Sequence, residues 1–274
     1  MTIHSNGFSR ERHGPWAVIA GASDGLGEEF AHHAAAAGIN CILVARRAPV
    51  LQQLADTLQA KYGVQALPAV VDLSVPDAAA QMLKTAGERE VGLFIYNAGG
   101  DTTGKPFHQM PLSHWQALLR RNIDTLVASC HAFGEKMSER KRGGILLVGS
   151  NAAFGGAPRM ALYTATKAFD VNFGESLWAE LQPRNVDVLN LVFSTSSTPT
   201  FKNTLAEHGI PLESVGDVAT PAEVAGAAVA AFQNGPTLVY THKGHAEDPQ
   251  QTTAARRERV VHMATHLNAF FGEG

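Results

Sequence analysis

The sequence predicts an α/β fold in which one parallel sheet of seven strands is covered by helices on both faces, the arrangement called doubly wound. Short, wholly apolar runs alternate along the chain with longer stretches of helical periodicity. Strands that are apolar without alternation are buried on both faces, so a layer of helices is needed on each side. The 274 residues, 45% of them hydrophobic, are enough for one such domain over 1–274, and no repeat or linker breaks the pattern before about residue 243.

Each element can be placed along the chain. The seven strands are expected at 16–20, 41–45, 66–71, 91–97, 144–150, 186–193 and 237–240. Helical patterns lie at about 25–37, along the run with Val50, Leu51, Leu54 and Leu58, at 112–138 and at 161–182. Residues 1–14 are expected to form a polar extension, and 243–274 a second extension with an amphipathic helix. Crossovers in such sheets are right-handed. Ligands of open parallel sheets bind beyond the carboxyl ends of the strands, so a site is expected there.

Charge and cysteine content narrow the class of protein. The formal net charge is −3 and no basic face is indicated, which argues against a nucleic-acid partner. Cys41 and Cys130 lie in apolar segments outside any CxxC pair, which indicates free buried thiols in a reducing compartment. No apolar run reaches membrane-spanning length, and the polar N-terminus lacks the apolar core of a secretory signal. A cytoplasmic enzyme or binding protein, without a membrane partner, is therefore expected.

Twelve histidines raise the question of a metal site. His262 and His266 are spaced to share one face of the last helix, but no cysteine or carboxylate at ligand spacing joins them. A solvated helix face explains the pair better, and no metal is predicted.

The first expected strand runs directly into "GASDGLG", with glycines at 21, 25 and 27. A strand, a glycine turn and a helix N-terminus form an anion site, because backbone N–H groups point outward and the helix dipole favours negative charge. The spacing is GxxxGxG rather than the commoner GxGxxG, and a purely structural turn is the alternative. Its place after the first strand favours dinucleotide binding, as in Rossmann-type proteins.

The end of the second strand bears on the choice of cofactor. Many NAD-dependent enzymes carry an acidic residue there to hold the adenine ribose 2′-OH. This chain has Ala45, followed by Arg46 and Arg47. A guanidinium pairs well with a 2′-phosphate, so Arg46 favours NADP(H) over NAD(H). An ordinary solvated basic pair is the alternative.

Further motifs follow the glycine turn in a fixed order. They are "DL" at 72–73, "NAG" at 97–99, Asn122 in "RRNID", Ser150, and "YTATK" at 163–167. Any one alone has an ordinary explanation, which for "NAG" is a strand-terminating turn. Together, over about 15–240, they resemble the short-chain dehydrogenase/reductase family in its single-domain branch.

The resemblance implies a cofactor site at the carboxyl ends of the first four strands. Asp72 would accept a hydrogen bond from the adenine amino group, with Leu73 beside the ring, and Asn97 and Ala98 would line the cofactor before a turn at Gly99. The residues expected to bind the cofactor are Gly21, Ser23, Asp24, Gly25, Leu26, Gly27, Arg46, Asp72, Leu73, Asn97, Ala98, Gly99, Tyr163, Lys167 and Thr198.

The resemblance also assigns Asn122, Ser150, Tyr163 and Lys167 to a catalytic tetrad. Taken singly, Asn122 could kink a helix, Ser150 could cap one, and Lys167 could be a surface charge. Chemistry gives a separate reason for the tyrosine and lysine, because hydride transfer to a ketone leaves an alkoxide that Tyr163 can protonate. Lys167, one helical turn away, favours the phenolate that serves as base in the reverse direction.

The other roles in the tetrad rest on the resemblance. Ser150 would hydrogen-bond the substrate carbonyl and the developing oxyanion. Lys167 would also bind the nicotinamide ribose, and Asn122 would hold a water that links Lys167 to solvent.

The sequence departs from the family pattern after the sixth strand. Phe193 and Ser194 replace the usual Pro-Gly, which leaves open the loop path and the contact of Thr198 with the nicotinamide carboxamide or the pyrophosphate. Residues 194–216 occupy the place of the family's substrate lid. Its apolar residues would either face a hydrophobic substrate or merely pack the lid. They are Phe201, Leu205, Ile210, Leu212 and Val215.

The sequence therefore predicts an oxidoreductase that transfers a hydride between NADP(H) and a fairly hydrophobic ketone or secondary alcohol. The alternative is a non-catalytic NADP(H)-binding regulator, which would not need Ser150 or Tyr163. An epimerase or dehydratase would usually carry a larger C-terminal domain than the residues after Tyr240 provide. The resemblance also implies a homodimer or homotetramer built on the helices at 112–138 and 161–182.

Overall fold

The computed structural model contains one parallel sheet of seven strands and describes residues 7–101, 103–207, 209–215, 218–240 and 265. The strands are β1 Trp16–Ala20, β2 Asn40–Ala45, β3 Ala66–Val70, β4 Val91–Tyr96, β5 Gly143–Val148, β6 Val186–Phe193 and β7 Thr237–Tyr240. Their order is β3-β2-β1-β4-β5-β6-β7, and neighbouring strands are parallel throughout. The predicted Rossmann-type sheet is confirmed, with the topological switch between β1 and β4.

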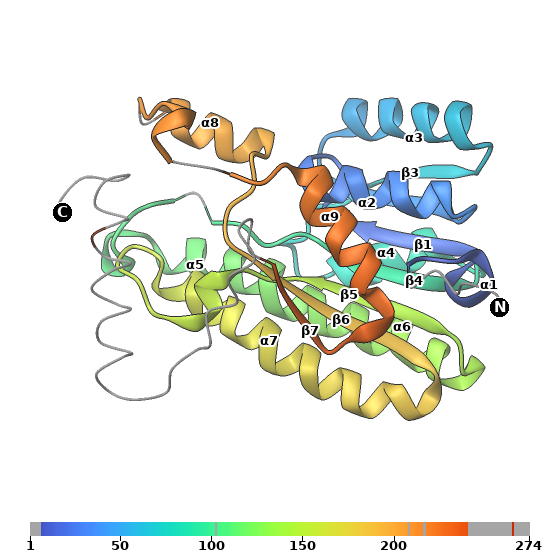
Figure 1. Cartoon of the computed structure of the whole chain (residues 1–274). Coiled ribbons are helices and arrows are strands. Elements are labelled where there is room, and N and C mark those ends of the chain that lie inside the picture. Colours follow the sequence, from blue (N-terminus) through green and yellow to red (C-terminus); the bar gives the residue numbers. More distant parts are fainter. Residues whose placement is uncertain (1–6, 102, 208, 216–217, 241–264, 266–274) are drawn as a thin grey trace.

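Helices form a layer on each side of the sheet (Figure 1). One face packs against α2 Gly25–Ala36, α3 Ala48–Tyr62 and α9 Pro221–Ala231. The other packs against α4 Ala78–Ala86, α6 Thr125–Arg140 and α7 Ala161–Leu181. The other α-helices with bounds in the described part of the chain are α1 Arg10–His13, α5 Leu112–Leu119 and α8 Pro199–Glu207.

β1 explains why the strands are apolar without alternation. Ala17 and Ile19 belong to the core under α2, α3 and α9, whereas Val18 and Ala20 belong to the core under α4, α6 and α7. Successive side chains of a strand point to opposite faces, so both sets must be apolar when both faces are covered.

Local signals set the helix ends. α9 begins with a capping box, in which Thr220 Oγ1 accepts from the Glu223 N–H and the Glu223 carboxylate accepts from the Thr220 N–H. α3 ends at Tyr62 and is capped by Gly63, whose φ of 69° lies in the left-handed region that glycine enters without strain.

The helix predicted over 112–138 is interrupted by a π-helical turn. The turn spans Arg120–Asp124 between α5 and α6, and the Thr125 N–H bonds to the Arg120 carbonyl five residues back. Asn122 lies inside it and is 2% exposed. Such turns recur at functional sites. The helix irregularity considered for Asn122 is therefore present, and it lies where α5 and α6 meet the sheet.

The sequence-based boundaries agree closely with the observed ones, with one consequence for the site. β5 ends at Val148, so Ser150 lies in the following loop rather than in the strand. The predicted lid holds α8 and the short turn Leu212–Val215. Apart from Thr265, the predicted C-terminal helix with its histidine pair lies outside the described residues.

The state of the two cysteines and the length of the helices can be compared with the sequence-based expectations. Cys41 and Cys130 are free and buried, as predicted. Within the part of the chain that the structure describes, no helix combines the length and apolarity needed to cross a membrane.

A buried ion pair ties the amino-terminal side of the sheet together. Arg12 Nε lies 2.5 Å from Asp187 Oδ2, and His13 Nε2 lies 2.9 Å from the same oxygen. His13 is fully buried, and burial lowers its pKa despite the raising effect of Asp187. Burial alone would raise the pKa of Asp187, but hydrogen bonds from His13 and Arg12 outweigh it and lower that pKa.

We expect Asp187→Ala to lower the free energy of unfolding by roughly 2–4 kcal/mol at neutral pH, because His13 and Arg12 lose a buried acceptor. Since folding lowers the pKa of Asp187, its stabilisation is present above the unfolded carboxyl pKa of about 3.9 and is lost as pH falls through the folded value. Urea unfolding at several pH values measures both effects. The control is Glu90→Ala at the half-exposed pair with Arg142, which should cost less than about 1 kcal/mol. Equal losses in the two variants would contradict the account.

Candidate active site

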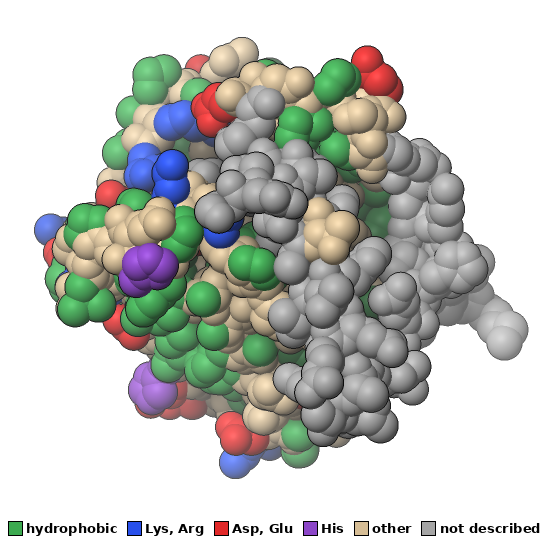
Figure 2. Space-filling model, turned by 90° about the vertical axis from the view of Figure 1, so that its left-hand side faces the viewer, with side chains coloured by type: hydrophobic (Ala, Val, Ile, Leu, Met, Phe, Trp, Pro, Cys, Tyr) green, Lys and Arg blue, Asp and Glu red, His purple; other side chains and the backbone are tan. Residues whose placement is uncertain are grey.

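A cleft of about 820 Å³ opens at the carboxyl ends of the central strands. It is lined by the loops after β1 to β4, by α5 and α7, and by the start of α8. Figure 2 looks onto this side of the molecule, where basic side chains lie together beside a broad area of hydrophobic ones. The cleft therefore lies where doubly wound sheets bind their ligands.

The glycine turn is packed too closely to accept side chains. A Cβ at Gly27 would collide with the Gly21 carbonyl, and one at Gly25 would lie 2.6 Å from Thr198 Cγ2. Gly21 has a φ of +83°, and Asn97 Nδ2 donates a 3.0 Å hydrogen bond to its carbonyl. α2 begins at Gly25, so its N-terminus faces the cleft. This cradle fits an anionic pyrophosphate.

The loop after β6 brings Thr198 against that turn. Thr198 lines the cleft beside Gly25, and its Oγ1 accepts from the Phe201 N–H at 3.1 Å at the start of α8. Phe193, one of the two replacements for the family's Pro-Gly, also lines the cleft. The departure from the family pattern thus leaves Thr198 beside the predicted phosphate site.

Two arginines after β2 differ in what they contact. Arg47 Nη2 donates to the Ser23 carbonyl at 2.6 Å and lies 3.8 Å from Asp24 Oδ2, so Arg47 is tied to the glycine turn. Arg46 is exposed and lines the cleft, and its guanidinium makes no hydrogen bond or ion pair with another described residue. Arg46 is therefore the arginine available to a ligand.

Asp72 lies on the cleft wall at the end of β3, next to Leu73. Its Oδ1 accepts from the Ser74 hydroxyl at 2.7 Å and from the Ser74 N–H at 2.9 Å. These bonds lower the pKa of Asp72, so the carboxylate is ionised at neutral pH and can accept hydrogen bonds.

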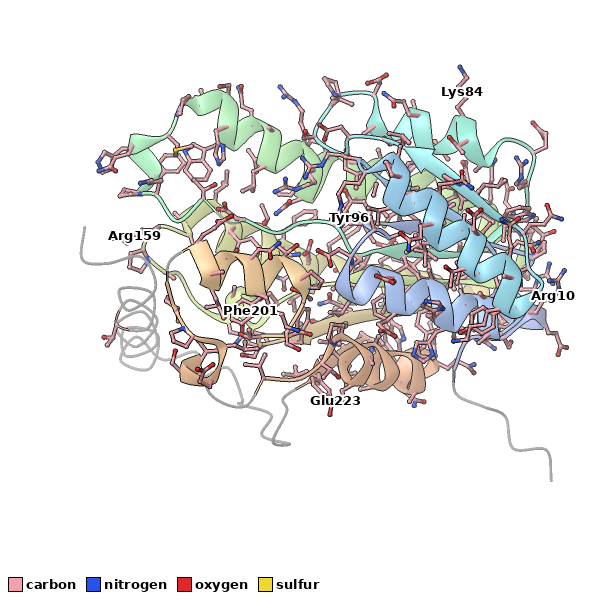
Figure 3. All side chains as sticks on the ribbon, turned by 90° about the horizontal axis from the view of Figure 1, so that it is seen from above. Arg10, Lys84, Tyr96, Arg159, Phe201 and Glu223 are labelled. Carbon is pink, nitrogen blue, oxygen red and sulfur yellow. The ribbon has the colours of Figure 1, made fainter. Side chains whose placement is uncertain are left out.

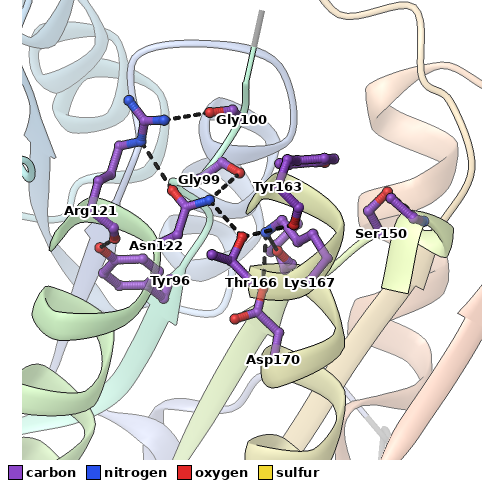
Figure 4. Close-up of polar contacts among 12 residues, drawn as sticks. Tyr96, Gly99, Gly100, Arg121, Asn122, Ser150, Tyr163, Thr166, Lys167 and Asp170 are labelled. Atoms are coloured by element: carbon purple, nitrogen blue, oxygen red, sulfur yellow. Dashed lines mark hydrogen bonds and ion pairs between the residues drawn. The ribbon is translucent and has the colours of Figure 1, made fainter. Parts of the chain in front are cut away.

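Tyr163 and Lys167 lie on one face of α7 and both line the cleft. Lys167 Nζ is 5.9 Å from the centre of the Tyr163 ring. The ammonium is buried, and it donates to the Val148 carbonyl at 3.0 Å at the end of β5 (Figure 4). The predicted pairing of a phenol with a lysine at the cleft is thus present in the structure.

Asn122 lies beneath the cleft wall, next to the lysine. Its Nδ2 donates to Thr166 Oγ1 at 3.0 Å and to the Gly99 carbonyl at 3.3 Å, and its Oδ1 accepts from Arg121 Nε at 3.2 Å. A Cβ at Gly99 would come within 3.2 Å of Lys167 Nζ. Gly99 also has a φ of +136°, which side chains rarely adopt, so glycine is favoured where the loop after β4 passes the lysine.

Ser150 stands apart from the other three members of the predicted tetrad. It caps a short turn at Asn151–Phe154, where its Oγ accepts from the Ala152 N–H at 3.2 Å. Among the described residues that line the cleft, Ser150 does not appear, and Figure 4 places it on the far side of Tyr163 from Asn122. The predicted contact of Ser150 with a substrate stays a prediction.

The remaining predicted cofactor residues lie together. Of the fifteen residues expected to bind the cofactor, Gly27 alone does not line the described cleft, because it packs beneath the glycine turn.

Sequence reasoning missed three polar residues around the lysine. Arg121 lines the cleft, donates to the Gly100 carbonyl through Nη2, and has a pKa that burial lowers. Thr166 supports Asn122, and Asp170 accepts from Lys167. The signal for Asp170 was present in the sequence, since a carboxylate three residues after the lysine shares its helix face.

The predicted lid reaches the glycine turn. Thr200 Oγ1, on α8, donates to Asp24 Oδ2 at 2.7 Å. Seen from above, α8 with Phe201 lies at the same end of the molecule as Arg159 (Figure 3). Leu205 is 2% exposed, so this member of the apolar set packs the lid rather than facing the cleft.

The fold and the cleft together define a Rossmann-type nucleotide-binding protein. A family model described as short chain dehydrogenase matches residues 15–209, and the chain belongs to that family. The protein is accordingly an oxidoreductase that acts on alcohol or carbonyl groups with a nicotinamide dinucleotide.

Two kinds of curated relatives are similar to the chain. A 7beta-hydroxysteroid dehydrogenase of Clostridium sardiniense is 30% identical over 192 residues, which are 70% of this chain and 73% of the relative. A very-long-chain 3-oxoacyl-CoA reductase of Laccaria bicolor is 34% identical over 188 residues, which are 67% of this chain but 56% of that relative.

Solved structures share the architecture over most of the chain. A 7beta-hydroxysteroid dehydrogenase structure superposes with a TM-score of 0.81 at 23% identity and covers 96% of this chain and 99% of its own, which shows the fold. A short-chain dehydrogenase from Sphingobium yanoikuyae in complex with NADPH gives a TM-score of 0.74 at 27% identity, covering 93% and 95%.

Proposed function

We propose that this protein is an NADP(H)-dependent carbonyl reductase or alcohol dehydrogenase with Tyr163 as the proton donor. The observation that carries the proposal is the position of Tyr163 beside the buried Lys167 ammonium, in the same cleft as the glycine turn. A phenol and a nearby ammonium are the groups that proton transfer to an alkoxide requires.

In this mechanism, different residues bind the cofactor, transfer the proton and stabilise the phenolate. The dinucleotide, when bound, supplies or accepts the hydride. The glycine turn and the N-terminus of α2 hold its pyrophosphate. Tyr163 donates a proton to the substrate oxygen in reduction and, as phenolate, accepts it in oxidation. Lys167 stabilises the phenolate by its positive charge.

Asn122 and Ser150 act around that pair in the proposal. Asn122 is held on three sides, so it fixes the loop after β4 beside Lys167. Ser150 would turn its hydroxyl from the cap of the short turn toward the substrate oxygen and stabilise the negative charge that develops there.

A fairly hydrophobic carbonyl compound is the proposed substrate class. The cleft wall includes Phe193, Ala117 and Leu118. The names of the similar curated relatives, a hydroxysteroid dehydrogenase and a very-long-chain acyl-CoA reductase, point to bulky apolar substrates for those proteins. Both observations support the same class for this one.

The proposed cofactor is NADP(H). Arg46 has a guanidinium without another described partner, placed at the strand end where a 2′-phosphate would be read. The similar short-chain dehydrogenase solved with NADPH is in agreement.

The proposed assembly is a homodimer or homotetramer built on α6 and α7. Phe169 and Phe173 on α7 stack with ring centroids 5.3 Å apart and are only partly buried. Both side chains pack against the core on one side, and their exposed parts would be covered by a second copy of the chain in the proposed assembly.

Loss of the phenol hydroxyl should abolish turnover. We expect Tyr163→Phe to reduce the rate of NADPH-dependent ketone reduction by at least about a hundredfold, because it removes the proton donor. The rate is followed by nicotinamide absorbance with a panel of apolar ketones, and NADPH binding should be almost unchanged. Tyr62→Phe on α3 is the matched control and should keep full activity. If Tyr163→Phe keeps most of the rate, another group donates the proton. If the wild type binds NADPH but reduces no ketone, the alternative of a non-catalytic NADP(H)-binding regulator is favoured.

Charge reversal at Arg46 should change cofactor preference. We expect Arg46→Asp to lower the NADPH-to-NADH ratio of kcat/KM by at least about tenfold, because a charge-assisted contact becomes a repulsion. Arg47→Ala is the comparison, since Arg47 holds the glycine turn and its loss should weaken both cofactors alike. An unchanged ratio in Arg46→Asp would remove the basis for NADP(H) preference.

A further inference from the structure

A second buried charge, the carboxylate of Asp170 on the same helix, pairs with the Lys167 ammonium. Its Nζ lies 3.0 Å from Asp170 Oδ2, and the two side chains are 5% and 2% exposed. The same ammonium donates to the Val148 carbonyl at 3.0 Å. Asp170 Oδ1 has no hydrogen-bond partner among the described residues. Most of what stabilises this carboxylate therefore comes from one ammonium.

The acceptors of the Lys167 ammonium and the Tyr163 ring lie on different sides of it. An ammonium has three N–H donors, and two of them point toward Val148 and Asp170. Tyr163 lies on the other side, with its ring centre 5.9 Å from Nζ. In Figure 4 the ammonium stands between the tyrosine and the carboxylate. One donor is left for the side that faces the cleft.

Besides this pair, Arg121, His114 and Asp101 line the cleft that Tyr163 faces, and two titratable side chains lie near Asp170. Tyr96 on β4 and Cys130 on α6 interact electrostatically with Asp170, and burial raises the pKa of each, so both are neutral. Burial also raises the pKa of Asp170, and Lys167 opposes that effect. The hydrogen bond and the short distance nevertheless favour the ionised pair.

We propose that Asp170 is a positioning residue of the active site, which holds the Lys167 ammonium on the sheet side and offsets its charge as seen by Tyr163. The phenol then keeps its proton to a higher pH than the lysine alone would allow. Carbonyl reduction needs the protonated phenol, so Asp170 widens the pH range of that direction. The consequence for turnover rests on the proposed function, whereas the effect on Tyr163 does not.

The test is an ultraviolet titration of tyrosine ionisation that needs no substrate. The wild type and Asp170→Asn are each compared with the same protein carrying Tyr163→Phe, so that the difference isolates Tyr163. We expect its midpoint to fall by about one pH unit in Asp170→Asn, because a nearby negative charge is removed while the ammonium remains. Glu180→Gln, at an exposed position on α7, removes the same charge and should leave the midpoint unchanged. An unchanged or raised midpoint in Asp170→Asn overturns the proposal.

A conservative variant separates charge from packing. Asp170→Glu keeps the negative charge and should return the midpoint close to the wild-type value, whereas a merely structural role would make Asn and Glu behave alike. Circular dichroism establishes that each variant is folded. Should Asp170→Asn not fold, Asp170→Ser removes the same charge and is judged by the same midpoint.

Turnover then separates this inference from the proposed function. In Asp170→Asn the alkaline limb of the pH profile for ketone reduction should move down by the same amount as the Tyr163 midpoint. A folded, active variant with an unchanged profile contradicts the role of Asp170 alone. A shifted midpoint in a wild-type protein that reduces no ketone contradicts the proposed function and leaves the pairing supported.

Discussion

The site depends on the burial of one ammonium beneath one phenol. An unpaired charge in a protein interior is costly, so Lys167 can occupy its position only because the end of β5 and its own helix supply acceptors. Val148 contributes a carbonyl and Asp170 a carboxylate, each at 3.0 Å. The same ammonium lies 5.9 Å from the centre of the Tyr163 ring, where its positive charge would stabilise a phenolate in the proposed mechanism.

The fold brings these groups together from distant parts of the chain. The parallel sheet places the loops after β1, β3, β4 and β5 at one edge, and α7 crosses that edge with Tyr163 and Lys167 facing the cleft. Two close approaches then fix the spacing. Gly27 packs under the Gly21 carbonyl, and Gly99 passes beside Lys167. A Cβ would collide with backbone at Gly27 and crowd Lys167 at Gly99, so close backbone packing shapes both ends of the cleft.

Much of this arrangement could be predicted from the sequence. Short unbroken apolar runs between helical patterns indicate buried strands, so the sheet and the position of its carboxyl edge followed from residues such as Ile19 and Val44. The order of the motifs predicted that Gly25, Asp72 and Tyr163 share one cleft, and all three line it. These features are local or periodic, and local features are what a single sequence records best.

The rest depended on packing that a pattern does not encode. The sequence predicted Arg46 as the cofactor arginine but did not show why Arg47 is unavailable, because Arg47 is held by contacts with Ser23 and Asp24 in the turn after β1. The π-helical turn at Asn122 reflects how α5 and α6 meet the sheet. Ser150 was expected at the end of β5, but the strand ends at Val148 and Ser150 caps the next turn.

Isotope tracing tests the central claim most directly. Enzyme is incubated with an apolar ketone and NADPH that carries deuterium at the transferable position, in ordinary water, and the alcohol is analysed by mass spectrometry. The account predicts one deuterium on the carbinol carbon with the wild type, and no labelled alcohol in the same time with Lys167→Met. Unlabelled alcohol from the wild type, or equal labelled product from Lys167→Met, would contradict it.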